Sequence, residues 1–253
     1  MTRQRCLVIG GIIAFLIGTL AGIPAQIGLR FVGVAAAQSS GVAGSIWHGE
    51  ARTIELRGVR LSQIRWALSP LGLLAGHLTG EASADFTGGR ASGEFIAGIT
   101  GAVGCRDCLI KGSTEALRGF VPVRDLGGDF NVHFDRFEWR KGWVRRAVGT
   151  AEFRNMPITL EGQSALPGVT GGYSATVAAD PVPDNGYFDA EIHDSAGPLK
   201  VEGKIKLSPP GNYEFAGKLA PKPGAPAPLV NGLQMLGPRT PDGSYSVGFS
   251  GSF

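Results

Sequence analysis

The sequence predicts an all-β protein: a single N-terminal transmembrane helix followed by a curled antiparallel β-sheet or sandwich domain with one or two short helices. After the N-terminal run, many short segments alternate between apolar and polar side chains, which is the period of a β-strand. Turn-forming residues separate these segments, as in antiparallel hairpins. The 40 glycines and 16 prolines among 253 residues also disfavour long helices.

The first predicted element is a membrane anchor. Arg3 and Arg5 precede the uncharged run Cys6–Ile23, which as a helix would span about 27 Å, close to the hydrocarbon thickness of a bilayer. Basic residues stay on the cytoplasmic side, so the N-terminus is predicted to be cytoplasmic. The predicted domains are 1–25, the cytoplasmic N-terminus and transmembrane anchor, and 26–253, a β-rich domain on the far side of the membrane.

A cleaved signal peptide is the alternative to an anchor. Ile23-Pro24-Ala25 and Ala35-Ala36-Ala37 are both acceptable cleavage sites. The apolar run is longer than a signal core of about 7–15 residues, and the second site lies far beyond its end, so an uncleaved anchor is favoured. Either interpretation exports the rest of the chain.

Small residues recur every four positions in the predicted anchor. These residues are Gly10, Ala14, Gly18 and Gly22. They would share one helix face and let another transmembrane helix approach closely. Glycine is common in membrane helices in any case, so ordinary composition remains an equal alternative to a packing strip.

Alternation defines the strands after the anchor. In Leu199–Leu207 the odd positions are apolar, apart from Gly203, and the even positions are lysine or glutamate, as in a half-buried strand. The same pattern predicts strands that include Ile54, Ile64–Leu68, Phe130–Phe134, Phe188–Ile192, Tyr213–Leu219 and Tyr245–Phe253. Such a sheet could form an ordinary sandwich core, or its apolar face could be a groove for acyl chains or a partner segment.

Two segments interrupt the strand pattern. Leu219–Leu229 contains four prolines and is predicted to be an extended connector, because proline cannot donate to a sheet ladder. Leu229–Gly237 is predicted to be a short helix, since its leucines are spaced three and four apart. Ser69–Gly76 is predicted to form one helical turn or a tight bend, with proline in the first turn.

The sequence predicts no catalytic, metal-binding or cofactor-binding residues. None of the histidines has zinc-site spacing; they are His48, His77, His133 and His193. No serine lies in a GxSxG motif and no glycine-rich loop matches a phosphate cradle. His193, Asp194 and Ser195 are adjacent on a predicted strand, where neighbours face opposite sides, which disfavours a triad. A net charge of only +3 does not indicate a nucleic-acid partner.

Five basic residues alternate with aromatic residues in Arg136–Arg146, RFEWRKGWVRR. We expect a β-hairpin that turns at Lys141-Gly142 and packs its aromatic side chains inside. A docking surface for an acidic partner or for lipid head groups is the functional alternative.

Cys105 and Cys108 form a CxxC motif. The α/β context of a redox-active CxxC is missing, and the third cysteine, Cys6, lies in the anchor, so a zinc knuckle lacks ligands. In an oxidising compartment we expect a disulfide that clips a short loop, with a local effect.

The segment GSIWHGEA, residues 44–51, places His48 and Glu50 beside Trp47. No second metal ligand accompanies His48, and no set of catalytic residues accompanies Glu50. We therefore expect Trp47 to be a core residue at the entry to a strand, with His48 and Glu50 facing solvent.

The same region carries a family resemblance. Its motif residues are Gly44, Trp47, Gly49, Trp66, Pro70, Leu74 and Gly76. With the C-terminal Asp242-Gly243-x-Tyr245 and Ser250-Gly251, the chain resembles the type II secretion system protein N family over nearly its whole length. The first part is also distantly similar to AsmA-type proteins, whose curled sheets suggest lipid handling.

The resemblance implies a non-enzymatic accessory component of the type II secretion apparatus. It would be a single-pass protein of the bacterial inner membrane, with residues 26–253 in the periplasm and other inner-membrane secretion-system proteins as partners. The alternative is an envelope lipid- or peptide-binding groove protein of the AsmA-like type.

Overall fold

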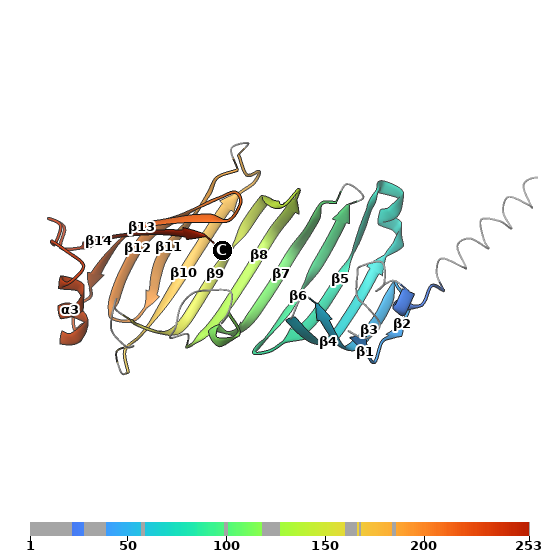
Figure 1. The fold of residues 1–253 in the computed structure, drawn as a ribbon, viewed down its shortest axis with the longest axis horizontal. Coiled ribbons are helices and arrows are strands. Elements are labelled where there is room, and N and C mark those ends of the chain that lie inside the picture. Colours follow the sequence, from blue (N-terminus) through green and yellow to red (C-terminus); the bar gives the residue numbers. More distant parts are fainter. Residues whose placement is uncertain are drawn as a thin grey trace, which may run out of the picture. The chain divides into compact units, whose positions relative to one another are not determined.

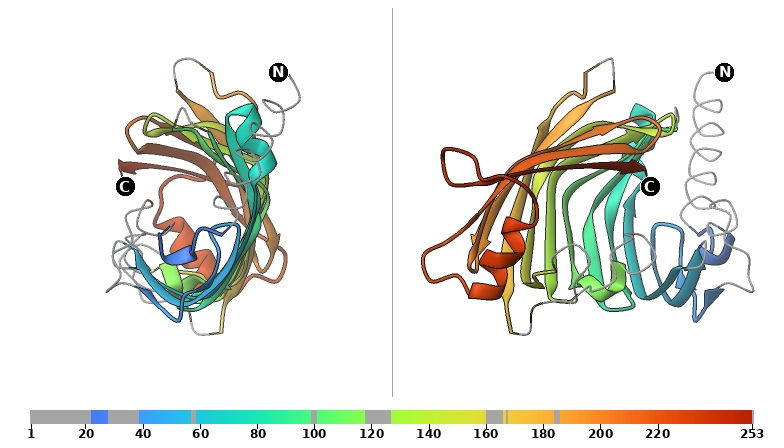
Figure 2. Two further views of the ribbon diagram at one scale, coloured as in Figure 1. Left: turned by 90° about the vertical axis from the view of Figure 1, so that its right-hand side faces the viewer. Right: turned by 60° about the vertical axis from the view of Figure 1, so that its left-hand side comes forward.

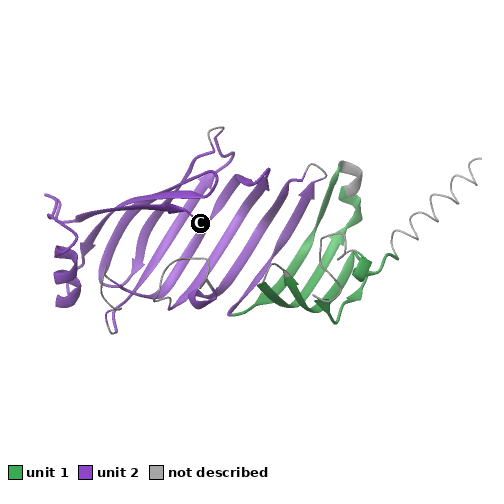
Figure 3. Cartoon of the chain, in the orientation of Figure 1, with its two compact units in different colours: residues 1–87 green, residues 88–253 purple. Residues whose placement is uncertain are grey.

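The computed structural model describes residues 22–27, 39–56, 59–98, 101–117, 127–159, 166, 168–183 and 186–252. The chain divides into two compact units, Met1–Thr87 and Gly88–Phe253 (Figure 3). The predicted β-rich domain, 26–253, therefore contains the whole of the second unit and most of the first. Each unit is described by itself.

Unit 1 is an antiparallel sheet. Its strands are β1 (Ser39–Ser40), β2 (Ala43–Gly44), β3 (His48–Leu56), β4 (Val59–Ser69) and β5 (His77–Phe86). They lie in the order β1-β3-β4-β5, and the two-residue strand β2 also pairs with β3 (Figure 1). The 3-10 helix η2 (Pro70–Ala75) joins β4 to β5, which confirms the helical turn predicted over Ser69–Gly76.

Unit 2 is a longer antiparallel meander, in which each strand pairs with the next in the sequence (Figure 1). Its strands are β6 (Gly89–Gly98), β7 (Val103–Ser113), β8 (Asp129–Arg140), β9 (Trp143–Pro157), β10 (Thr170–Ala179), β11 (Phe188–Ala196), β12 (Leu199–Ser208), β13 (Asn212–Pro221) and β14 (Tyr245–Ser252). These strands form one open sheet, so the all-β antiparallel prediction is confirmed and the sandwich alternative is wrong for this unit.

The predicted alternation gives the sheet of unit 2 one apolar and one charged face. Ile205 lies opposite Ala190 and Phe215, and this apolar row ends at Phe249. In the adjacent row Lys204 lies opposite Glu191, and the two side chains form an ion pair of 3.0 Å. Every strand alternates with a period of two, and the register aligns these alternations. Apolar side chains therefore lie beside apolar ones, and charged side chains beside charged ones.

The strands of unit 2 curve around the apolar face (Figure 2). Register shifts occur where β6 pairs with β7, β8 with β9, and β10 with both its neighbours. A bulge inserts an unpaired residue that bends its strand and increases its twist. The prediction of a curled sheet is therefore confirmed for this unit.

Helix α3 (Ala227–Gln234) packs on the apolar face of unit 2 (Figure 2). Leu229 and Leu233 are fully buried, and they share a core cluster with Leu199, Val201 and Tyr245. The helix predicted over 229–237 is confirmed, but it starts two residues earlier and ends at Gln234. It can start early because Pro228 lies in the first turn, where a missing backbone N–H breaks no helical hydrogen bond.

A further short helix, η3 (Thr114–Leu117), was not predicted. Its four residues are too few to show helical periodicity in the sequence. Thr114 is fully buried, and its hydroxyl donates to the carbonyl oxygen of Gly128 at 3.2 Å. The position of η3 therefore depends on a contact with a residue distant in the sequence, not on a local sequence signal.

No helix within the described ranges combines the length and hydropathy that crossing a bilayer requires. The predicted anchor lies almost wholly outside those ranges, together with Gly10, Ala14 and Gly18 of the packing strip. Gly22 is described as an exposed turn residue. The anchor and the strip remain predictions.

Candidate functional site

Trp66 on β4 packs against the neighbouring antiparallel strand β3, where it lies opposite Gly49. The indole Nε1–H of Trp66 donates to the carbonyl oxygen of Ile46 at 3.1 Å. Its ring lies against Gly49, where an added Cβ would stand 2.4 Å from Trp66 Cζ2. Glycine at position 49 is therefore required for the ring to cover the strand.

The turn before β3 holds Trp47 in a buried position. The hydroxyl oxygen of Ser45 accepts the backbone N–H groups of Trp47 and His48, at 3.2 and 3.1 Å. Trp47 is 8% exposed, whereas His48 and Glu50 are exposed. The structure confirms the sequence prediction for these three residues.

The other motif residues shape the backbone. Gly44 has φ +88°, and a Cβ there would stand 2.4 Å from the carbonyl oxygen of His48. Pro70 begins η2, and Gly76 follows it with φ 75°. The side chain of Leu74 lies outside the description. Gly44, Gly49 and Trp66 are thus brought together, while Pro70 and Gly76 bound a connection.

The C-terminal motif is an anchored turn in unit 2. The Asp242 carboxylate accepts from Lys218 Nζ at 2.6 Å and from the hydroxyl groups of Thr240 and Ser244. The Lys218 ammonium and these hydroxyl groups hold the pKa of Asp242 well below its ordinary value. This turn positions Tyr245, which is 5% exposed in the α3 core.

The basic segment Arg136–Arg146 forms the predicted hairpin. Lys141 and Gly142 both have positive φ, 53° and 79°, as a two-residue hairpin turn requires. Trp143 is 7% exposed and its Nε1–H donates to the carbonyl oxygen of Gly186 at 2.8 Å. The prediction that every aromatic side chain packs inside is wrong for Trp139. That residue is 40% exposed because it lies at the strand end beside the turn.

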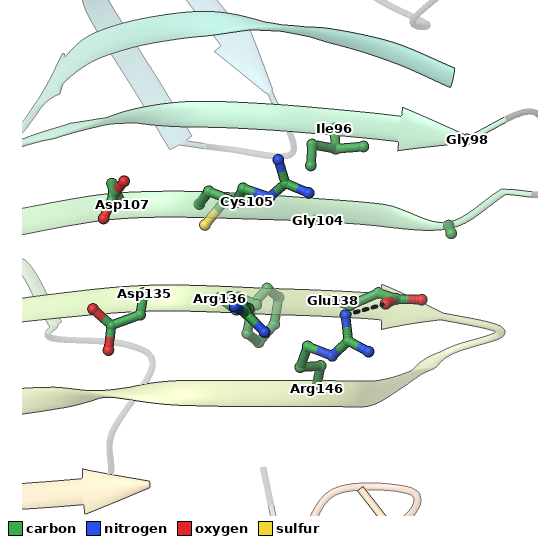
Figure 4. A pocket seen from close by; sticks show the side chains of 12 residues that line it. Ile96, Gly98, Gly104, Cys105, Asp107, Asp135, Arg136, Glu138 and Arg146 are labelled. Carbon is green, nitrogen blue, oxygen red and sulfur yellow. Dashed lines mark ion pairs between the residues drawn. The ribbon is translucent and has the colours of Figure 1, made fainter. Parts of the chain in front are cut away.

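The charged face of the hairpin lines an open pocket of about 880 Å³ (Figure 4). Three arginines and three acidic residues contribute to its lining; they are Arg106, Arg136, Arg146, Asp107, Asp135 and Glu138. Asp180, which no sequence motif singles out, pairs with Arg136 at 3.1 Å and with Arg146 at 2.5 Å. The lining charges balance, so the pocket does not favour a ligand of either sign.

Cys105 and Cys108 are joined by a disulfide bond on β7, with 6.0 Å between their Cα atoms. Asp107, between them, has φ 47° and lies at a register shift against β6. A Cβ at Gly93 on β6 would stand 2.4 Å from Cys108 Sγ. The bond closes a loop of only a few residues, and its fit to β6 depends on glycine at position 93.

One group of side chains on β7 and β8 has the ligand types of a metal site. Asp107, His133 and Asp135 each offer one ligand atom, and these atoms lie within 4.8 Å of one another. His133 Nε2 lies 3.8 Å from the Asp107 carboxylate, and His133 Nδ1 lies 3.8 Å from the Asp135 carboxylate. Both aspartates are exposed, as surface carboxylates commonly are, and no catalytic role follows from the group. The sequence could not reveal it because Asp107 lies on a different strand from the other two.

Asp194, weighed above as a triad member, instead holds two segments of unit 2 together. Its carboxylate accepts the backbone N–H of Val201 at 2.8 Å and pairs with Lys222 Nζ at 2.5 Å. Burial alone would raise the pKa of Asp194, but Lys222 and the Val201 N–H together keep it below its ordinary value. Burial, with the nearby Asp194 charge, raises the pKa of Tyr173. These contacts indicate a structural role.

Replacing Asp194 with asparagine is expected to lower the free energy of unfolding at pH 7 by about 1–3 kcal/mol, because a charged, hydrogen-bonded carboxylate is lost. A carboxyl group whose pKa is lower in the folded than in the unfolded protein stabilises the fold fully above its unfolded pKa, about 3.9. This stabilisation is lost as the pH falls through the folded pKa. The difference between variant and wild type should therefore shrink below about pH 4. Denaturant unfolding at several pH values measures it. Glu191→Gln, at an exposed pair, is the control; an equal loss at all pH values contradicts the assignment.

An exposed apolar patch crosses three strands of unit 2. Ala97 lies opposite Val103, and Val103 lies opposite Trp139. Val103 is 52% exposed, Trp139 40%, and the nearby Phe95 on β6 39%. We call Phe95, Ala97, Val103 and Trp139 the apolar patch. Adjacent exposed apolar side chains are typical of surfaces that bind other proteins or membranes.

Antiparallel pairing of consecutive strands, motif residues that fix turns and strand packing, and an exposed apolar patch define an all-β protein of meander topology. The chain belongs to the type II secretion system protein N family, whose family model matches residues 35–248. It is 25% identical to a type II secretion system protein N of Aeromonas hydrophila, over 95% of each chain. No solved structure matches it significantly. The resemblance inferred from residues 44–76 is thereby confirmed.

Proposed function

We propose that this chain is a non-enzymatic accessory component of the type II secretion apparatus. Its N-terminal segment anchors it in the inner membrane, and its β-rich units lie in the periplasm and bind other secretion-system proteins. Membership of the protein N family supports a place in the apparatus. The apolar patch is the observation that supports a docking role.

The chemistry of the patch fits a protein partner. Val103 and Trp139 are cross-strand neighbours on a sheet, so both side chains are held in fixed directions before any partner arrives. Tryptophan is among the residues that contribute most to protein interfaces. A partner that covers these side chains removes apolar area from water without ordering a loop.

The membrane arrangement rests on the sequence. Two arginines precede an uncharged run of bilayer length, and basic residues are retained in the cytoplasm. Reporter fusions at the C-terminus, one active only in the periplasm and one only in the cytoplasm, test the orientation. A soluble mature form that begins near residue 26 or 38 would contradict the anchor.

Val103→Asp and Trp139→Asp are expected to reduce secretion and the co-purification of other secretion-system proteins, because a charge must be desolvated when the patch is covered. Both positions are exposed, so the chain should stay folded and membrane-bound. Leu71→Asp, at a residue 75% exposed and outside the patch, is the matched control. The measurements are secreted enzyme activity and co-purification at equal expression. Unchanged secretion in both patch variants would refute the docking role.

A lipid- or peptide-binding groove is the second candidate. The curved, apolar face of unit 2 favours it, because α3 packs on one part of that face, beside Leu199, Val201 and Tyr245, and apolar side chains elsewhere on it are exposed. Phe249, on the same face, is 58% exposed. Mass spectrometry of the chain purified from membranes tests this candidate. A stoichiometric lipid that is lost in Phe249→Asp supports the groove, and lipid equally present in both does not.

A further inference from the structure

We propose that β14 pairs with β14 of a second copy of this chain, in antiparallel orientation, so that the sheet of unit 2 continues from one copy into the other. β14 is the last strand in the sheet order, and among the described residues only β13 pairs with it. Its outer edge therefore presents unpaired backbone N–H and C=O groups. This inference goes beyond the proposed function and does not depend on it.

The edge of β14 lacks the features that normally prevent strand addition. Tyr245–Ser252, YSVGFSGS, contains no charged residue and no proline. It pairs with β13 over eight consecutive residues without a register shift, so no bulge turns it away. In unit 1, by contrast, β1 and β2 are only two residues long. Short strands, charges, prolines and bulges are the usual protections of a sheet edge.

The sequence of β14 is suited to pairing with itself. Around Gly248 the order Ser246-Val247-Gly248-Phe249-Ser250 is symmetric in side-chain type. A two-fold axis at Gly248 places Val247 opposite Phe249 of the second copy, twice, and Ser246 opposite Ser250 of the second copy. Aromatic–β-branched pairs and serine pairs both stabilise neighbouring antiparallel strands, and no like charges meet.

This pairing also covers exposed apolar surface. Phe249 is 58% exposed, although its ring stacks on Phe215 with 4.9 Å between centroids. A two-fold axis perpendicular to the sheet keeps the apolar faces of both copies on the same side. Each Phe249 then gains a valine neighbour on its open side. A heterologous strand could use the same edge, but the symmetry of side-chain types favours a second copy.

Gly248 offers a direct test, because only the residue on the two-fold axis lies opposite the same residue of the second copy. A Cβ at Gly248 would have no neighbour closer than the carbonyl oxygen of Phe215, at 3.4 Å, so cysteine fits there. Directly opposite residues have Cα atoms about 4.5–5.5 Å apart, within the range of a disulfide. Ser252, on the same strand and face, would lie about 27 Å from its own copy, given a rise of 3.4 Å per residue.

The experiment uses the full chain in the cells that produce it, with Cys6→Ser to remove the cysteine that is not part of the Cys105–Cys108 disulfide. Gly248→Cys and, as control, Ser252→Cys are oxidised mildly and separated without reductant. We expect at least tenfold more dimer from Gly248→Cys than from Ser252→Cys. Adding Val247→Lys to the Gly248→Cys chain should lower the dimer about tenfold, because it puts two lysines opposite two phenylalanines.

Three results would overturn the proposal. Equal dimer from Gly248→Cys and Ser252→Cys would show random collision. Crosslinking of Gly248→Cys only to a different protein would show that another partner adds to the edge. Dimer unaffected by Val247→Lys, with the circular dichroism of the purified chain unchanged, would exclude the proposed register.

Discussion

Trp47→Ala and Trp66→Ala are expected to be among the most destabilising substitutions in unit 1, each lowering the free energy of unfolding by about 3–5 kcal/mol. Trp47 is 8% exposed, and Trp66 both covers Gly49 and donates to the Ile46 carbonyl oxygen. Truncation removes buried aromatic area, and in Trp66→Ala it also leaves that carbonyl without its indole partner. Denaturant unfolding of the purified chain measures the loss.

Two controls separate packing from surface chemistry in this segment. His48→Ala and Glu50→Ala remove exposed side chains and should change the free energy of unfolding by no more than about 0.5 kcal/mol. Trp66→Phe should fall between wild type and alanine, because it keeps a ring over Gly49 but loses the indole donor. A His48 variant that stays folded but abolishes secretion would contradict the structural interpretation of GSIWHGEA.

Leu229→Ala or Leu233→Ala is expected to lower the free energy of unfolding by about 2–5 kcal/mol. Both side chains are fully buried between α3 and the sheet of unit 2, beside Leu199, Val201 and Tyr245. A short helix has little stability alone, so α3 depends on this packing and should detach before the strands separate. Hydrogen exchange of residues 227–234 detects such detachment.

The matched control for α3 is Met235→Ala. Met235 directly follows the helix and is 77% exposed, so its truncation should change both stability and exchange little. Equal protection of residues 227–234 in Leu233→Ala and in wild type would show that α3 does not need the core contact.

The strands could be predicted because their signals are local. Alternation in Leu199–Leu207 assigns each side chain to a face without knowledge of the neighbouring strands. Lys141-Gly142 predicts a hairpin turn because two adjacent residues must adopt positive φ. The burial of Trp47 is also predictable, since a large aromatic side chain next to a strand is seldom left in water.

The clusters of the charged face could not be predicted, because their members are distant in the sequence. Asp180 meets Arg136 and Arg146 only after β8, β9 and the segment beyond β10 have been placed side by side. The alternating aromatic pattern predicts that Trp139 is buried, yet this residue lies at a strand end and is 40% exposed. Alternation assigns each side chain to one face of the sheet, but it does not show which other segments cover that face.

The amino-acid sequence is sufficient to predict the all-β class, the strand faces, the main turns and the family, because each of these depends on the order of neighbouring residues. Tertiary structure decided that unit 2 is an open curved sheet, that Gly49 and Gly93 make room for Trp66 and Cys108, and that β14 is left as an edge. These features depend on which strands meet and in what register. Contacts between residues far apart in the chain set the strand register and decide which segments cover each face of the sheet. Alternation with a period of two contains no information about either.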